Sequence, residues 1–223
     1  MTERLIALVP LRAGSKGLPG KNVRLLAGKP LFRHAVDQGL AAGAEVWIST
    51  DIPELAAMDH GAGVQVMARP ADLAADSTPM DPVIAHALGV IGGAGRVVLL
   101  QATSPLRTAA DILDGVAVHK TGAHDLVMSV CAADRGVLKW GTIADGTFHP
   151  LRRPEYCFMN RQALPAVHRP NGAVYVFDAD WFRTRGSLAT DRIGAFEMPL
   201  DRSLDIDGAD DFSRAEDWIA RNM

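Results

Sequence analysis

The sequence has few cysteines, no long apolar run and no excess of basic residues. Its two cysteines, Cys131 and Cys157, are too few for a disulfide framework, and neither belongs to a Cys-x-x-Cys pair of the kind that binds zinc or carries redox chemistry. No apolar run reaches the roughly 18 residues that a membrane-spanning helix needs. The formal net charge of −3 supplies no basic field for nucleic acid. We therefore expect neither a membrane nor a nucleic acid as a partner.

The apolar segment 5–9 near the N-terminus also lacks the features of a signal peptide. It is preceded by Thr-Glu-Arg and followed by proline, and no small-residue cleavage site comes after it. This pattern indicates a buried first strand, so we expect a cytoplasmic protein.

The sequence does have short apolar runs that alternate with helical patterns. The run 96–101 (RVVLLQ) is almost wholly apolar, as expected for a strand buried on both faces. Strands separated by helices form right-handed βαβ units, so we predict an α/β fold with a mainly parallel, doubly wound sheet. The 223 residues fit a single domain, 1–223, with or without an appendage. The predicted strands are 5–9, 45–49, 64–67, 96–101 and 125–130, and the predicted helices are 29–42, 53–60, 79–91 and 108–119, the last with Thr108 as its N-cap.

The segment 134–170 breaks this alternation. It is rich in arginine and proline and is too long for an ordinary compact loop, so we interpret it as an active-site flap or as an interaction arm inserted in the domain. Beyond it we predict strands at 172–177 and 195–198 and a terminal helix around 212–220.

The loop after the first predicted strand has the composition of a phosphate site. It leaves the carboxyl end of that strand, where ligands bind in parallel sheets, and its three glycines let backbone N–H groups approach an anion. Arg12, Lys16 and Lys21 would repel one another unless a polyanion lay among them. The ATPase pattern is not met, because Ser15 stands where it needs glycine and Asn22 where it needs a hydroxyl residue. The alternative is a solvated, mobile glycine-rich turn.

A second constellation is the sequence RSLDID at 202–207. If this stretch is extended, Asp205 and Asp207 share one face while the apolar residues beside them point to the core. Two adjacent carboxylates repel unless a cation joins them, and Mg²⁺ typically takes one or two carboxylates together with substrate phosphates. The alternative is that these aspartates cap the terminal helix, a role that Asp210 and Asp211 fit better.

Seven motifs together carry a resemblance to a known family. They are RAGSKGLPGKN at 12–22, GKPL at 28–31, STD at 49–51, RPADLA at 69–74, LLQATSPLRT at 99–108, RPNGAVYV at 169–176 and SLDID at 203–207. In this order, and over nearly the whole chain, the sequence resembles the acylneuraminate cytidylyltransferases (CMP-sialic acid synthetases). The resemblance implies a fold of the nucleotide-diphospho-sugar transferase type and a small arm that packs on a second subunit, hence a homodimer. It also implies transfer of CMP from CTP to the anomeric hydroxyl of a nine-carbon 2-keto sugar acid, with Mg²⁺ as cofactor and pyrophosphate as product.

The same resemblance implies roles for individual residues. The expected catalytic residues are Arg12, Lys21, Asp205 and Asp207, and the two aspartates are the expected metal ligands. The expected nucleotide site comprises Arg12, Ser15, Lys16, Lys21, Asn22, Arg69 and Thr78. The expected sugar site comprises Gln101, Thr103, Ser104, Arg107, Lys139, Arg161, Gln162, Arg169, Asn171 and Tyr175, among which an arginine such as Arg107 could pair with the sugar carboxylate. For the arginine-rich arm, binding of the partner subunit is the alternative role.

Two departures from the family pattern bear on the substrate. Pro79 and Met80 stand where sialic-acid members tend to have small hydroxyl residues, which looks closer to the branches that act on legionaminic or pseudaminic acid. The stretch 183–194 lacks paired aromatic residues that some members use against the N-acyl group, for which Trp181 and Phe182 could substitute. Two other functions stay open: a nucleotidyltransferase for another base or sugar acid, and a non-catalytic nucleotide-sugar binding protein.

Overall fold

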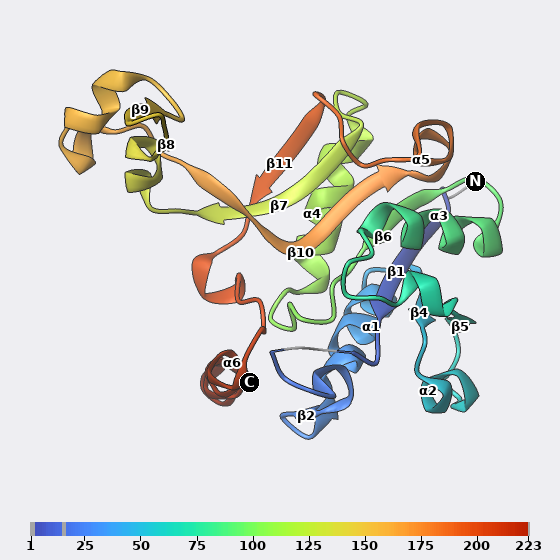
Figure 1. The fold of residues 1–223 in the computed structure, drawn as a ribbon. Coiled ribbons are helices and arrows are strands. Elements are labelled where there is room, and N and C mark those ends of the chain that lie inside the picture. Colours follow the sequence, from blue (N-terminus) through green and yellow to red (C-terminus); the bar gives the residue numbers. More distant parts are fainter. Residues whose placement is uncertain (1–2, 15–16, 223) are drawn as a thin grey trace.

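A seven-stranded sheet forms the centre of the molecule (Figure 1). The computed structural model describes residues 3–14 and 17–222. The strand order is β11-β7-β10-β6-β1-β4-β5, and every neighbouring pair is parallel except those that involve β10. The strands are β1 (Leu5–Leu11), β4 (Glu45–Thr50), β5 (Val64–Ala68), β6 (Arg96–Leu99), β7 (Leu126–Ala132), β10 (His168–Asp178) and β11 (Ile193–Glu197). The prediction of a mainly parallel α/β sheet is confirmed.

Helices cover both faces of this sheet. The helices are α1 (Leu31–Ala41), α2 (Pro53–Ala57), α3 (Met80–Ile91), α4 (Ala109–Lys120), α5 (Ala179–Arg185) and α6 (Ala209–Asn222). Alternate residues of β1 point to opposite faces: Ala7 and Val9 join the core under α1 and α4, whereas Ile6 and Leu8 join the core under α3 and α5. A third apolar cluster packs α6 against Leu26, Leu106 and Ile206.

Side chains cap the first turns of α4 and α6, as the sequence predicts. The Thr108 side chain accepts a hydrogen bond from the Asp111 backbone N–H at 3.3 Å, and the Asp111 carboxylate accepts one from the Thr108 N–H at 2.7 Å, which completes a capping box on α4. At α6, Asp211 accepts hydrogen bonds from the N–H groups of Asp207 and Gly208, both at 3.1 Å. The capping role predicted for Asp211 is therefore confirmed.

Several predicted boundaries differ from the structure. The helix predicted at 29–42 begins at Leu31, because β3 (Lys29–Pro30) pairs with β2 (Leu25–Leu26) across a turn in which Gly28 has a φ of 77°. The helix predicted at 53–60 ends at Ala57. The stretch 203–207 forms no strand, yet it keeps the predicted alternation: Ile206 is buried, while Asp205 and Asp207 are exposed.

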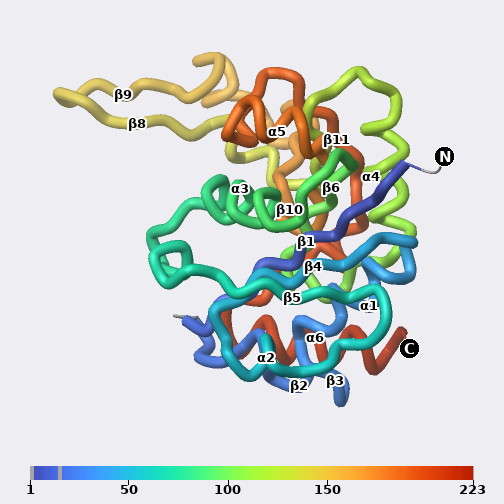
Figure 2. The backbone as a smooth tube through the Cα atoms, turned by 90° about the vertical axis from the view of Figure 1, so that its right-hand side faces the viewer, coloured from blue at the N-terminus to red at the C-terminus, as the bar shows by residue number. Residues whose placement is uncertain are grey.

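Residues 134–167 form an arm that stands away from the central sheet, whereas 168–170, the end of the predicted segment, begin β10 and pair with β7. The arm contains a hairpin of β8 (Gly141–Ala144) and β9 (Thr147–Pro150), which projects from the body in Figure 2. Three short 3-10 helices flank the hairpin: η3 (Arg135–Lys139), η4 (Pro154–Phe158) and η5 (Arg161–Ala163). Large apolar side chains on the arm face solvent, among them Phe158 at 91% and Ile143 at 77% exposure.

Within the described ranges 3–14 and 17–222, no helix combines the length and the apolar character needed to cross a membrane.

Candidate active site

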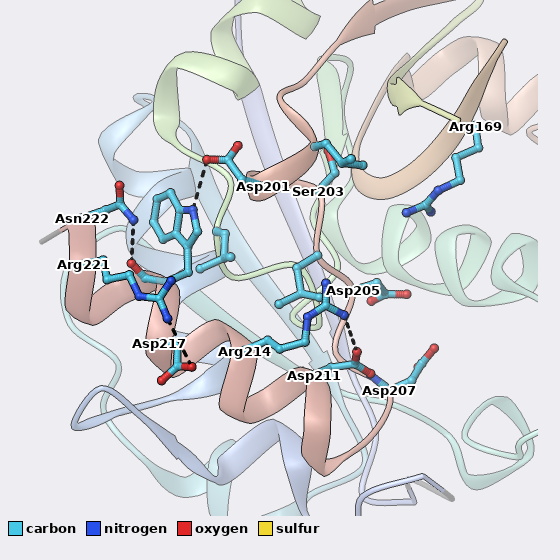
Figure 3. A pocket seen from close by; sticks show the side chains of 14 residues that line it. Arg169, Asp201, Ser203, Asp205, Asp207, Asp211, Arg214, Asp217, Arg221 and Asn222 are labelled. Carbon is cyan, nitrogen blue, oxygen red and sulfur yellow. Dashed lines mark hydrogen bonds and ion pairs between the residues drawn. The ribbon is translucent and has the colours of Figure 1, made fainter. Parts of the chain in front are cut away.

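Two cavities meet at Asp207, at the edge of the sheet where β1, β5 and β6 end. The smaller cavity, of about 410 Å³, is lined by Pro10, Arg12, Gly17, Lys21, Asn22, Arg69, Met80, Gln101, Ala102, Thr103 and Asp207. The larger one, of about 810 Å³, lies beside α6 (Figure 3) and also contains Asp205, Arg169, Arg214 and Trp218. Ligands of open α/β sheets bind at this edge of the sheet.

The loop that follows β1 forms one wall of the smaller cavity. Gly20 has a φ of 68°, in the left-handed region, and begins the 3-10 turn η1 (Lys21–Val23). The buried Asn22 side chain donates a hydrogen bond to the Arg12 carbonyl oxygen at 2.9 Å, which closes the loop on itself. Two residues predicted for the nucleotide site, Ser15 and Lys16, lie outside the described residues.

This loop contacts the acidic segment near the end of the chain. The Lys21 ammonium donates a hydrogen bond to the Ile206 carbonyl oxygen at 2.7 Å and lies 3.4 Å from the Asp207 carboxylate. The Lys21 side chain is 13% exposed, whereas that of Asp207 is 82% exposed, so the carboxylate is open to a ligand in either cavity. The structure thus brings together Lys21 and Asp207, which were both expected among the catalytic residues.

The two carboxylates suit a hard divalent cation. Partial burial raises the pKa of Asp205 above its usual value, and the neighbouring carboxylates of Asp207 and Asp211 raise it further, against the hydrogen bond from Thr103 and the charge of Lys21. Over residues 3–14 and 17–222, no group of three or more His, Cys, Asp and Glu side chains could hold a metal ion. Two carboxylates completed by phosphate oxygens would fit Mg²⁺ carried by a nucleotide.

Two arginines face the smaller cavity from different strand ends. Arg69, at 8% exposure, donates hydrogen bonds to the Ser49 carbonyl oxygen at 2.7 Å and the Ser49 hydroxyl at 3.2 Å. Burial lowers the pKa of Arg69, with Asp51 acting against this and Arg12 adding to it. The Arg12 guanidinium is paired with the Asp76 carboxylate. A cavity with two guanidinium groups and an ammonium is suited to a polyanion.

The residues predicted for the sugar site are separated by the structure into three places. Gln101 and Thr103 line the smaller cavity and Arg169 lines the larger one, while the half-buried Tyr175 hydroxyl has its pKa raised by burial and by Asp205. Lys139, Arg161 and Gln162 lie in the arm: the Lys139 ammonium donates to the Met159 carbonyl at 2.5 Å, and the Arg161 guanidinium pairs with Asp134 at 2.8 Å. The remaining residues are Ser104, Arg107 and Asn171, which are buried inside the fold.

The position of Arg107 differs from the one predicted. It is 2% exposed, and it donates hydrogen bonds to the carbonyl oxygens of Gln101 at 2.7 Å and Ala173 at 3.1 Å, so its guanidinium ties two chain segments together inside the protein. Burial lowers its pKa to about 9. Asn171 is likewise held inside, by Ser129 at 2.5 Å and Ser203 at 2.9 Å. Thr78 of the predicted nucleotide site is half-buried, and its hydroxyl donates to the Asp72 carbonyl oxygen at 3.0 Å.

A family model described as cytidylyltransferase matches residues 6–186. This chain belongs to the cytidylyltransferase family. It is 29% identical over 211 residues to an N-acylneuraminate cytidylyltransferase of Streptococcus agalactiae serotype III, a match that covers 93% of this chain and 51% of the relative. It is 31% identical over 237 residues to a CMP-N,N'-diacetyllegionaminic acid synthase of Legionella pneumophila, covering 99% of this chain and 98% of that one. The chain therefore spans about half the length of the streptococcal relative.

Solved structures show the same fold. A CMP:2-keto-3-deoxy-manno-octonic acid synthetase in complex with CTP superimposes with a TM-score of 0.74 at 17% identity, covering 99% of this chain and 100% of that one. A 4-diphosphocytidyl-2C-methyl-D-erythritol synthase of Anaerococcus prevotii gives a TM-score of 0.67 at 13% identity, covering 98% and 99%. The fold of this cytidylyltransferase is thus the nucleotide-diphospho-sugar transferase fold.

Some residues at or beside this cytidylyltransferase site were not among those predicted from the sequence. Asp51 accepts a hydrogen bond from the Ala13 N–H at 2.9 Å and so anchors the loop after β1 to the end of β4. Met80 presents an apolar side chain to the smaller cavity. The carboxylate of Asp111 pairs with Arg202. The motif STD at 49–51 could have indicated Asp51, and the departure from the family pattern at position 80 could have indicated Met80. No sequence pattern links Asp111 to Arg202.

Proposed function

We propose that this cytidylyltransferase transfers CMP from CTP to the anomeric hydroxyl of a nonulosonic acid and releases pyrophosphate. The observation that carries the proposal is the contact between Lys21, in the cationic loop, and the segment with Asp205 and Asp207. A triphosphate lying in the smaller cavity would meet cationic groups on one side and the Asp207 carboxylate on the other, with Asp205 just beyond in the larger cavity. The sequence relatives from Streptococcus and Legionella, named for sialic and legionaminic acid, support this substrate class.

The chain's own residues have distinct tasks in this reaction. Arg12 and Lys21 bind the phosphates of CTP, and the fixed guanidinium of Arg69 closes the cavity beside Met80. Phosphoryl-type transfer depends mainly on such positioning and on neutralising charge around phosphorus. The Arg12 guanidinium has five N–H donors, so it can bind a phosphate while one terminal nitrogen keeps its contact with the Asp76 carboxylate.

The junction of the two cavities is the proposed place for the sugar acid. Gln101 and Thr103 approach it from the smaller cavity, and the guanidinium of Arg169 points toward it from the larger one (Figure 3). Arg169 can pair with the sugar carboxylate, and amide and hydroxyl groups can bind the sugar hydroxyls. The anomeric oxygen then forms a bond to the α-phosphorus while the bond from that phosphorus to the pyrophosphate oxygen breaks.

We propose Mg²⁺ as the cofactor, held by Asp205 and Asp207. When bound, it neutralises phosphate charge and lowers the pKa of a coordinated hydroxyl group. The pKa of Asp205 is raised first by its partial burial and then by the charges of Asp207 and Asp211, and a nearby cation would stabilise the ionised carboxylate against these effects.

We also propose that the arm joins two copies into a homodimer. Its exposed apolar side chains include Trp140, Ile143, Leu151 and Phe158, with exposures of 62%, 77%, 61% and 91%. Several large apolar side chains exposed on one short arm are typical of an interface. Sedimentation equilibrium should give twice the chain mass of 23.8 kDa; a monomer at micromolar concentration would refute the dimer.

The proposed activity is tested with a substrate panel. The protein is incubated with Mg²⁺, each of the four nucleoside triphosphates and sialic, legionaminic, pseudaminic or octulosonic acid, and pyrophosphate is measured. Release with CTP and a nonulosonic acid supports the proposal. Release with another base or only with octulosonic acid contradicts it, and binding without release indicates a nucleotide-sugar binding protein.

A matched pair of variants tests the role of the carboxylates. Asp207→Asn should lower turnover by about 10²-fold or more, because a ligand for charge neutralisation is lost, while the fold is kept. Asp210→Asn removes the same charge from the exposed start of α6, three residues along, and should keep turnover near that of the unaltered protein. Equal turnover of the two variants would remove Asp207 from the proposed site.

A further inference from the structure

The segment 203–207 carries the two carboxylates of the proposed site, yet it belongs to no helix or strand. Its position must therefore come from side-chain and single backbone contacts. The Ile206 N–H donates a hydrogen bond to the Thr103 carbonyl oxygen at 2.8 Å. At the other end of the segment, the Ser203 hydroxyl accepts from the Asn171 amide at 2.9 Å and donates to the Pro199 carbonyl oxygen at 2.8 Å.

An ion pair between Arg202 and Asp111 lies directly before this segment, at the end of the 3-10 helix η6 (Leu200–Arg202). Both oxygens of the Asp111 carboxylate accept hydrogen bonds from the two terminal nitrogens of Arg202, one of them at 2.9 Å. The side chains of Asp111 and Arg202 are only 6% and 20% exposed. A paired, two-point contact of this kind fixes orientation as well as distance, and its burial protects it from screening by salt.

Asp111 is itself held rigidly. It lies in the first turn of α4 and accepts hydrogen bonds from the Thr108 N–H at 2.7 Å and the Thr108 hydroxyl at 2.8 Å. The next residue, Ile112, is fully buried in the main core. The ion pair therefore connects an irregular segment to one of the best-packed elements of the fold, three residues before Asp205.

We propose that Arg202 and Asp111 are positioning residues, which hold Asp205 and Asp207 in place to receive a divalent cation together with the nucleotide. This inference rests on the proposed function, because it concerns the same two carboxylates. Neither Arg202 nor Asp111 touches the substrates. Their loss should loosen the segment, so that the carboxylates spend less time in the arrangement that binds the metal. Loss of an outer group that contacts a metal ligand directly lowers metal affinity about 10- to 100-fold, and for this pair, which acts through the backbone, we expect an effect near the lower end of that range.

The test measures metal binding directly, without turnover. Mn²⁺ is titrated into the protein with CTP and no sugar acid, and free Mn²⁺ is followed by electron paramagnetic resonance. Arg202→Met, which keeps most of the apolar stem, should weaken Mn²⁺ binding by about tenfold or more, and Asp111→Asn should weaken it in the same direction. Arg202→Lys restores the charge without the fork and should fall between them and the unaltered protein.

The matched control is Arg183→Met on α5. Arg183 also pairs with an aspartate, Asp180 at 2.7 Å, and donates to the carbonyl oxygens of Gly93 and Leu88, but it lies away from the site. If Arg202 only stabilised the fold, both variants would lower the melting temperature and neither would change Mn²⁺ affinity; that result overturns the inference. If Arg202→Met does not fold, Arg202→Lys and Asp111→Asn test the inference instead. Unchanged Mn²⁺ affinity in both of these variants overturns it.

The proposed function and the positioning role fail in different ways. If the unaltered protein binds no Mn²⁺ with CTP, or if Asp207→Asn binds it equally well, the proposed metal site itself is refuted and the positioning role falls with it. If Asp207→Asn abolishes binding while the variants of Arg202 and Asp111 bind normally, only the positioning role is refuted.

Discussion

A single methyl group at Gly17 should separate the two halves of the site. A Cβ atom built on Gly17 would lie 2.2 Å from the Asp207 carbonyl oxygen, a contact with rigid backbone that cannot be relieved by turning a side chain. The loop and the acidic segment must move apart by about 0.8 Å before this distance reaches even 3.0 Å. The 3.4 Å contact between the Lys21 ammonium and the Asp207 carboxylate would stretch with it.

The size of the effect follows from this displacement. Misplacement of a reacting group by about 1 Å can lower the rate by about 10²-fold, or close to 3 kcal/mol of transition-state stabilisation. Gly17 lies in an exposed loop, so the chain can accommodate the methyl group by moving the loop outward, and the melting temperature should change little. Gly17→Ala should therefore lower turnover by about 10²-fold in a folded protein.

The assay is pyrophosphate release with CTP and the accepted sugar acid, run beside thermal unfolding. Gly14→Ala is the control. It makes the same glycine-to-alanine change in the same loop, but a Cβ atom at Gly14 meets nothing within 4 Å. Gly14→Ala should keep most of the turnover. Full activity of Gly17→Ala, or equal losses in the two variants, would refute the reasoning from the Gly17–Asp207 contact.

Two further predictions concern stability. Ile206→Ala should lower the free energy of unfolding by about 2–5 kcal/mol in urea titrations, because Ile206 is fully buried; the partly buried Leu204→Ala should cost less, and the reverse order would contradict the packing. His119 accepts a hydrogen bond from the Arg96 side chain at 2.9 Å, and burial, followed by the charge of Arg96, lowers its pKa below 6.5. The unfolded chain therefore takes up this proton first, so stability should be full above pH 6.5 and decline as the pH falls below it. His119→Gln should reduce this decline in urea midpoints measured at about pH 7.5 and pH 5. An unchanged decline would assign it to other groups, such as His34, whose pKa is also lowered by burial.

The parallel part of the sheet was predictable because each strand is an apolar run followed by a helical pattern. The antiparallel strand β10 between β6 and β7 was not, since an apolar run reads the same in either direction. The start of α1 was missed because a local hairpin, turned at Ala27 and Gly28 with positive φ, keeps Lys29 and Pro30 extended beside β2.

Within the site, the sequence identified charges but not their burial. Lys21 and Asp207 could be predicted to meet, because a loop at a strand end and an acidic pair both need counter-charges. Arg107 was expected to bind a carboxylate, yet it is buried: one terminal nitrogen donates to two main-chain carbonyl oxygens, while its Nε and its second terminal nitrogen have no hydrogen-bond partner among the described residues. Only the folded chain shows which polar groups are available to face a given side chain.

The contact between Lys21 and Asp207 joins residues that are 186 positions apart. During synthesis, Lys21 emerges early and cannot reach Asp207 until almost the whole domain has left the ribosome. Any nascent chain that ends before residue 207 is therefore expected to lack full affinity for CTP. The appearance of that affinity would mark the moment at which folding of the domain is complete.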